Sequence, residues 1–222
     1  MNWYHTCAPS SAKVAISSRR GGYALNGKLL ENTYEEWRAS PYARDGVQCQ
    51  GCHMPDPRHL WQGIHDRRMV KQALTIDLRH ERNGSALLAV LEATNSGVGH
   101  YFPTYVTPKV FLWLDLVDAS GRQVDGSLRE QVIGREVPLN LSREIYDTRL
   151  APKASLFMRA SWQVSRSDVR LRARIVVEPD HFYVRFFKAI IDNARQGRPQ
   201  LELALRQASD SPYTLFREER EI

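Results

Sequence analysis

Two cysteines and a histidine near residue 50 have the types and spacing that could perform specific chemistry. Cys49-Gln50-Gly51-Cys52-His53 is a C-x-x-C-H sequence, the attachment signature of haem c, in which two thiols add to vinyl groups and the adjacent imidazole binds iron. Two intervening residues let the thiols span one edge of the macrocycle, and Gly51 eases the turn between them. The motif predicts one covalently held haem, with Cys49 and Cys52 as the attachment positions and His53 as the proximal ligand.

A C-x-x-C pair also occurs in thiol redox sites and in zinc sites. A thioredoxin-like site needs a strand followed by a helix around the pair, and a zinc site needs a second C-x-x-C or a spaced histidine pair. The sequence shows neither pattern, and its remaining cysteine, Cys7, stands alone. Three cysteines therefore do not describe a disulfide framework. Haem binding is the favoured interpretation, ahead of a zinc or redox dithiol and of unmodified thiols.

The sixth position of the iron separates electron carriers, which fill it, from haem enzymes, which keep it open. His65 and His59 follow His53 closely enough for either ring to reach the far side of the haem. His100 lies in a glycine-rich loop between two predicted strands, which could aim an imidazole at a docked haem. Each of the three could instead be an ordinary hydrogen-bonded loop histidine. We expect the distal ligand among His65, His59 and His100, in descending but closely spaced order.

The elements that must position these residues fall into a short irregular part and a longer β part. The pattern at 33–39 predicts a short helix that ends before Pro41. The segment 46–66 is too irregular for a long element, and a helical turn could follow it at 67–74. From residue 74 apolar residues alternate in strand-like runs near 74–78, 87–91, 110–117, 155–162 and 169–177. Trp37 and Trp61 are expected to pack in the core or against the haem.

The C-terminal quarter predicts one helix and one more strand. Phe182, Phe186, Ile190 and Ala194 recur at helical intervals. The alternating leucines 201, 203 and 205 predict a final strand, and the charged tail is expected to fray.

The predicted fold class is mainly β (α+β): a small irregular and helical haem-binding region, then an antiparallel, immunoglobulin-like β-sandwich of about seven strands with one C-terminal amphipathic helix. The predicted parts are a flexible segment at 1–24, the haem-binding region at 25–72, and the sandwich domain at 73–222 with its helix near 181–196.

Composition narrows the function classes further. With 42% hydrophobic and 25% charged residues among 222, the chain can bury an ordinary core. The formal charge of +6 is mild, and arginines occur singly rather than in blocks, so we predict no nucleic-acid binding. A basic face could still steer acidic redox partners. No apolar run is long enough for an integral membrane segment, and the start lacks the layout of a signal peptide.

Several segments resemble the multihaem cytochromes c of the c-552/c-554 type. TYEEWRAS at 33–40 and GVQCQGCHMP at 46–55 are similar to the haem-binding segment of that family. HLWQGIHD at 59–66, GHYFPT at 99–104, FLWL at 111–114 and DASG at 118–121 are similar to its non-haem C-terminal module. The resemblance covers residues from about 25 to the end. It implies a periplasmic or exported electron carrier with bis-histidine haems and an attached β-sandwich.

The chain departs from this family in two respects. Relatives carry further C-x-x-C-H motifs upstream, whereas Cys7 has no second cysteine or following histidine, so we expect one haem c. The start lacks an export signal, which suggests a truncated or frame-shifted reading frame, cytoplasmic as given. The predicted function is electron transfer with redox partner proteins, including other haem subunits. The alternatives are a β-sandwich interaction module with an unloaded haem site, and an accessory domain of a multihaem reductase or oxidase.

Overall fold

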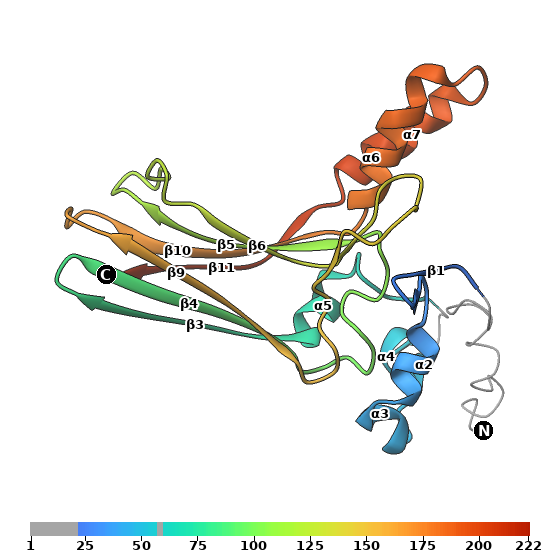
Figure 1. Cartoon of the computed structure of the whole chain (residues 1–222), viewed down its shortest axis with the longest axis horizontal. Coiled ribbons are helices and arrows are strands. Elements are labelled where there is room, and N and C mark those ends of the chain that lie inside the picture. Colours follow the sequence, from blue (N-terminus) through green and yellow to red (C-terminus); the bar gives the residue numbers. More distant parts are fainter. Residues whose placement is uncertain (1–21, 57–59) are drawn as a thin grey trace.

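The computed structural model describes residues 22–56 and 60–222 (Figure 1). The flexible segment expected at 1–24 lies outside these residues except for its last three, and Ala24 already belongs to strand β1 (Ala24–Leu25). Strand β1 pairs with β2 (Lys28–Leu29) across Asn26 and Gly27, which both have positive φ. Such a pair of residues forms the tight turn whose twist matches a two-stranded ribbon. The region predicted to bind haem therefore opens with a hairpin.

Two antiparallel sheets form the body of the molecule. One has the strand order β3-β4-β9 and the other β11-β10-β5-β6, which gives seven strands within the described residues, as predicted. A further two-stranded ribbon pairs β7 with β8. The bounds are β3 (Leu74–Asn83), β4 (Ala86–Asn95), β5 (Lys109–Val117), β6 (Arg129–Ile133), β7 (Arg135–Glu136), β8 (Tyr146–Asp147), β9 (Ser155–Gln163), β10 (Arg170–Glu178) and β11 (Tyr213–Glu221).

The main core lies between the two sheets. Leu78 and Leu91 from one sheet and Leu112, Leu114 and Ile175 from the other belong to one buried cluster. Next to them along the strands lie less buried side chains, such as Asp77, Trp113 and Arg174, because successive side chains of a strand point to opposite faces. The predicted mainly β, sandwich-like fold class is confirmed.

Short helices occupy one end of the sheets, where Figure 1 shows α2, α4 and α5 close to one another. Helix α2 (Thr33–Arg38) confirms the helix predicted there, and α5 (Arg67–Ala73) confirms the helical turn before the first long strand. Helices α3 (Pro41–Arg44) and α4 (Cys49–His53) lie between them. Asp66 caps α5 by accepting from the backbone N–H groups of Arg68 and Met69. The C-x-x-C-H sequence is therefore a single helical turn.

The predicted final strand at Leu201, Leu203 and Leu205 is wrong, because these residues lie in helix α7 (Arg198–Ser209). Gly197 precedes it in the left-handed conformation, which glycine adopts without strain, and a proline stands in its first turn, a position that favours a helix start. Leu201, Leu205 and Ala208 are its more buried residues, at helical spacing, while Leu203 is exposed. Helix α6 (His181–Ile190), followed by η2 (Ile191–Asn193), confirms the helix predicted near 181–196.

The tail that we expected to fray is strand β11 at the edge of the four-stranded sheet. It pairs with β10 along its whole length, and Leu215 is buried in the core. Its charged side chains pair with neighbours, as Glu219 does with Arg170 and Arg217 at 3.1 and 2.8 Å. Cross-strand pairing of this kind offsets the low β propensity of charged residues.

No helix of the described residues is long and apolar enough to span a bilayer.

Candidate haem-binding site

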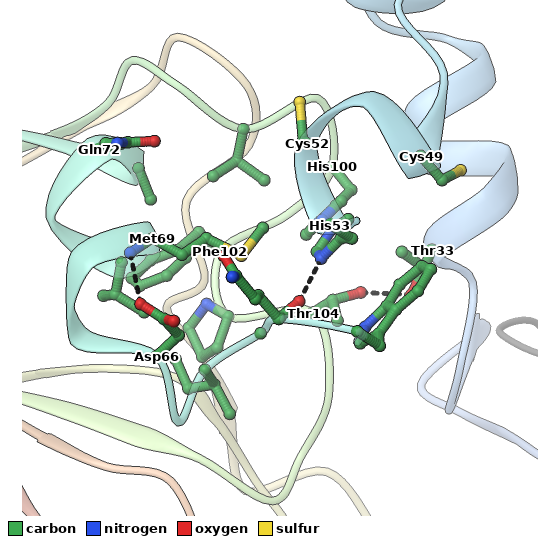
Figure 2. A pocket seen from close by; sticks show the side chains of 18 of the residues that line it. Thr33, Cys49, Cys52, His53, Asp66, Met69, Gln72, His100, Phe102 and Thr104 are labelled. Atoms are coloured by element: carbon green, nitrogen blue, oxygen red, sulfur yellow. Dashed lines mark hydrogen bonds between the residues drawn. The ribbon is translucent and has the colours of Figure 1, made fainter. Parts of the chain in front are cut away.

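A cavity of about 1160 Å³ lies where the short helices meet the loops of the sandwich. Ligand pockets usually measure about 300–1,000 Å³, so this one has room for a large cofactor. Cys49, Cys52 and His53 line it from the N-terminal helices, and His65 and His100 line it as well. The structure therefore gathers most of the predicted site residues around one space, as Figure 2 shows for the two cysteines, His53 and His100.

Helix α4 places the two thiols and the imidazole on one turn. Cys49 and Cys52 stand three residues apart, a spacing that makes them neighbours on a helix surface. Both thiols are free; Cys49 is half-buried and Cys52 is exposed. Burial raises the pKa of the Cys49 thiol. Free, neighbouring thiols beside a cavity can take the two thioether bonds that the motif predicts.

His53 is held by the segment that follows it. Its Nδ1 lies 2.7 Å from the carbonyl oxygen of Gln62, and the N–H of Gln62 donates to the carbonyl of His53 at 2.8 Å. The indole of Trp61 stacks on the imidazole with ring centres 4.5 Å apart and an interplanar angle of 5°. Burial lowers the pKa of His53. The ring is therefore fixed in orientation from one side by stacking and at Nδ1 by a carbonyl.

His100 reaches the same cavity from the loop after β4. Its Nδ1 lies 2.8 Å from the carbonyl oxygen of Tyr101. Burial, with a smaller contribution from His53, lowers the pKa of His100 to about 4. Since a carbonyl oxygen can only accept, the proton of each imidazole is on Nδ1 and the lone pair is on Nε2. Both rings are thus in the tautomer that offers Nε2 to a metal.

The ring centres of the two imidazoles are separated by a distance that suits a shared metal. Their ring centres are 6.1 Å apart and their planes differ by 16°. An imidazole nitrogen binds a metal at about 2 Å and the ring centre lies about 1 Å behind it, so two ligands in line place ring centres about 6 Å apart. Histidine ligands also usually donate their other N–H to a carbonyl or carboxylate, as His53 and His100 both do. The separation of the pair therefore matches that of two imidazoles bound to one metal ion.

The loop that carries His100 is packed tightly against the helices. A Cβ added to Gly97 would lie 2.1 Å from the backbone oxygen of Gln72 at the end of α5, so a side chain there would displace one backbone from the other. The buried side chain of Asn95 donates to the carbonyl oxygens of His100 and Leu150, both at 3.0 Å. The glycine at position 97 thus allows this loop to pack directly against the backbone of α5.

The other two candidate histidines are placed differently. The largely exposed His65 has Nε2 2.9 Å from a carboxylate oxygen of Asp180, which precedes α6. The same nitrogen would have to leave that carboxylate to bind a metal. His59 lies outside the described residues.

Sequence patterns did not reveal two residues that shape the site, Asn95 and Arg149. Trp61, expected to pack in the core or against the haem, stacks on His53. Arg149, whose guanidinium lies 5.1 Å from the ring centre of Tyr101, carried no sequence signal because its partners are distant in the chain.

Comparison with known proteins finds a likeness in structure but not in sequence. No family model matches the chain, and no curated protein matches it. The crystal structure of a penta-haem cytochrome c552 from Thermochromatium tepidum aligns with a TM-score of 0.65 and 19% identity, over 90% of this chain and 53% of that one. A structural-genomics target aligns at a TM-score of only 0.27, with 8% identity, over 47% of this chain and 72% of that one.

The chain thus spans about half the length of the penta-haem protein that it matches. At this identity the likeness concerns the fold alone, and it extends over nine-tenths of the present chain. The chain has the fold of part of a multihaem cytochrome c.

Proposed function

We propose that this chain is a c-type cytochrome that carries one haem and transfers electrons. Cys49 and Cys52 would hold the haem by thioether bonds, and His53 and His100 would be its axial ligands. The observation that carries the proposal is the pair of imidazoles next to the C-x-x-C-H turn, with ring centres 6.1 Å apart and each Nδ1 at a backbone carbonyl. We therefore place His100 ahead of His65 and His59 as the distal ligand.

The residues around the cavity fit a haem. The cavity is large, its walls combine apolar side chains with two neutral imidazoles, and two free thiols stand at one side. A bound haem c supplies one reversible electron at a potential set by its axial ligands and burial. What the chain adds is the orientation of both imidazoles, because Trp61 stacks on His53 while Asn95 holds the carbonyl of His100. Two strong ligands leave no open position for a substrate, which favours electron transfer over catalysis.

The remaining parts of the proposal extend this assignment. Residues 25–72 would form the haem-binding region and 73–222 the sandwich domain that supplies the distal ligand. The electron partners would be redox proteins, among them other haem-bearing subunits, since the structural neighbour is a penta-haem cytochrome. Covalent attachment would require export to the periplasm, where haem c is normally attached.

Mass and absorption measurements test haem loading directly. The chain is produced with a secretion signal in cells that attach haem c, beside a variant in which Cys49 and Cys52 are both alanine. We expect the wild type to gain the mass of one haem and to give sharp reduced bands that survive acid-acetone extraction, and the variant to lose both. A colourless wild type with unmodified thiols would refute the proposal and favour an interaction module without haem.

Matched histidine variants test the axial ligands. His100→Ala should convert the six-coordinate iron into a five-coordinate form that binds carbon monoxide without a slow displacement step. His65→Ala, which removes a ring lining the same cavity, should leave the wild-type spectrum unchanged. If His65→Ala opens the iron and His100→Ala does not, the assignment of the distal ligand is wrong. An open iron in the wild type would favour a role in a haem enzyme.

A further inference from the structure

The peptide group between His100 and Tyr101 is held at both ends by side chains from different parts of the chain. Its carbonyl oxygen accepts from the side-chain amide of Asn95, at the end of β4, at 3.0 Å. Its N–H donates to the Oε2 atom of Glu36, in helix α2, also at 3.0 Å. Because a peptide group is planar, anchoring both its oxygen and its nitrogen fixes its orientation. The backbone at His100 is therefore clamped between the haem-binding region and the sandwich.

Arg149 completes this clamp from the loop after β8. Its guanidinium donates to both carboxylate oxygens of Asp147 at 2.9 Å and to the carbonyl of Thr104 at 2.9 Å. It also lies 3.6 Å from the Oε1 atom of Glu36. A planar guanidinium with several partners holds them in one fixed arrangement, which a lysine cannot do. The segment from His100 to Thr104 is thus tied to Glu36 at its start and to Arg149 at its end.

We infer that Glu36 and Arg149 are positioning residues for the distal ligand. They hold the His100–Thr104 segment where the ring centre of His100 lies 6.1 Å from that of His53. The inference rests on the proposed function, since it concerns ligation of the haem iron. Its consequence is that the sixth ligand would stay on the iron only while Glu36 and Arg149 hold this segment.

The chemistry of Glu36 explains why a carboxylate is used at this point. Its side chain is 7% exposed, so an uncompensated charge would be costly. Burial raises the pKa of Glu36, and the guanidinium of Arg149 and the N–H of Tyr101 oppose this by stabilising the anion. Removing Glu36 leaves Arg149 paired with Asp147, so the variant does not leave a bare buried cation. Loss of Glu36 should therefore free the Tyr101 amide without unfolding the protein.

Two variants of Glu36 and one matched control test this role in the haem-loaded protein. Glu36→Ala removes the acceptor of the Tyr101 N–H, whereas Glu36→Gln keeps an amide oxygen there. The control is Glu144→Ala, whose side chain is also 7% exposed and also pairs with an arginine. The side chains that Glu144 pairs with, Arg135, Asn26 and Lys28, all lie outside the 100–104 segment. All three variants are compared in carbon monoxide kinetics and in the visible spectrum.

We expect Glu36→Ala to raise the rate of carbon monoxide association at least tenfold and to show a five-coordinate fraction, because His100 then leaves the iron more often. Glu36→Gln should stay within about twofold of the wild type. Glu144→Ala should lower the melting temperature but leave the carbon monoxide rate unchanged. Added imidazole should restore the six-coordinate spectrum of Glu36→Ala.

The outcomes separate this role from the proposed function. A loaded Glu36→Ala protein with wild-type carbon monoxide kinetics would overturn the positioning role alone. An equal rise in Glu144→Ala would show that any buried ion pair has the same effect, and would also overturn it. If Glu36→Ala does not fold, Arg149→Lys must show the faster association, or the role is wrong. Wild-type protein without haem would overturn the proposed function and this role together.

Discussion

Arg135 offers the sharpest test of what holds the region proposed to bind haem on the sandwich. Its side chain is completely buried, and its Nε donates to a carboxylate oxygen of Glu144 at 2.8 Å. The terminal nitrogens donate to the carbonyl oxygens of Leu29, Leu25 and Lys28 at 2.7, 3.1 and 3.2 Å. These three carbonyls belong to the β1–β2 hairpin. One guanidinium therefore satisfies the hairpin backbone that leads into helix α2.

The expected cost of Arg135→Met follows from these partners. Breaking a buried ion pair from one side costs about 3–5 kcal/mol. Glu144 keeps Asn26 and Lys28 as partners, so its charge is not left bare, and we place the cost near ~3 kcal/mol. Proteins of this size lose about 2–4 °C of melting temperature per kcal/mol, so the expected drop is about 6–12 °C. A cost of ~3 kcal/mol is a large share of the ~5–15 kcal/mol by which a folded domain is usually stabilised.

Thermal and urea unfolding followed by circular dichroism measure this effect. Arg135→Lys should fall between the wild type and Arg135→Met, because an ammonium keeps the charge but cannot bridge the carboxylate and three carbonyls. Arg79→Met is the matched control: Arg79 also pairs with carboxylates, those of Asp77 and Glu92, but is 60% exposed, so its loss should cost less than about 1 kcal/mol.

Two results would refute the reasoning on Arg135. If Arg135→Met unfolds within about 1 kcal/mol of the wild type, the hairpin is not held by this cation. If Arg135→Lys is as stable as the wild type, the fork of the guanidinium is irrelevant and only the charge matters.

Three further predictions concern other parts of the fold. Gly97→Ala should cost about 1–3 kcal/mol of stability and loosen the loop that carries His100, because its Cβ would lie 2.1 Å from a backbone oxygen of α5. Gly63→Ala, whose Cβ would lie 3.9 Å from the nearest atom, should be tolerated, and urea unfolding checks both variants. Burial alone would raise the pKa of Asp147, but hydrogen bonds from two cations outweigh it and lower the pKa. The carboxylate therefore stabilises the fold above about pH 4 and loses this contribution as pH falls, so the stability gap between wild type and Asp147→Asn should shrink from about pH 7 to about pH 3 in urea titrations. Leu215→Ala should cost about 2–4 kcal/mol of stability, because Leu215 in β11 is only 5% exposed. Leu203→Ala should cost less than about 1 kcal/mol, because Leu203 in α7 is 48% exposed. The reverse order in unfolding experiments would contradict this C-terminal structure.

The sequence was most informative where local pattern decides the structure. The alternation near Leu78, Leu91 and Leu112 predicted strands because one face of each strand is buried and the other is not. It misled at Leu201 and Leu205, where alternating leucines also satisfy one face of a short helix, and the glycine and proline at the start decide for the helix. Alternation over so short a run cannot separate the two periods.

The tail shows a second limit, since its strand depends on partners elsewhere in the chain. Charged residues such as Glu219 have low β propensity, and an isolated charged tail is expected to fray. Here Arg170, far earlier in the chain, lies in the neighbouring strand and pairs with it. No local window contains both residues, so no periodicity could have predicted the strand.

The ranking of the candidate distal ligands from the sequence used no long-range information. Sequence proximity to His53 placed His65 first, yet a ligand on the far side of a haem need not be near in the chain. In the structure, His100 lies 6.1 Å from His53 between ring centres, while His65 lies against Asp180. The glycines around His100 were the usable signal, because close backbone approach requires them.

This arrangement also bears on the division of the chain into a haem-binding region and a sandwich. His53 comes from the first part and His100 from the second, and the peptide after His100 is held by Asn95 from the sandwich and Glu36 from the haem-binding region. A sandwich that served only as an appended interaction module would have no reason to bring a buried, neutral imidazole to this cavity at the cost of desolvating it. Under the proposed function the sandwich supplies half of the ligand set, and the buried Arg149 at its edge keeps that half in register with the other.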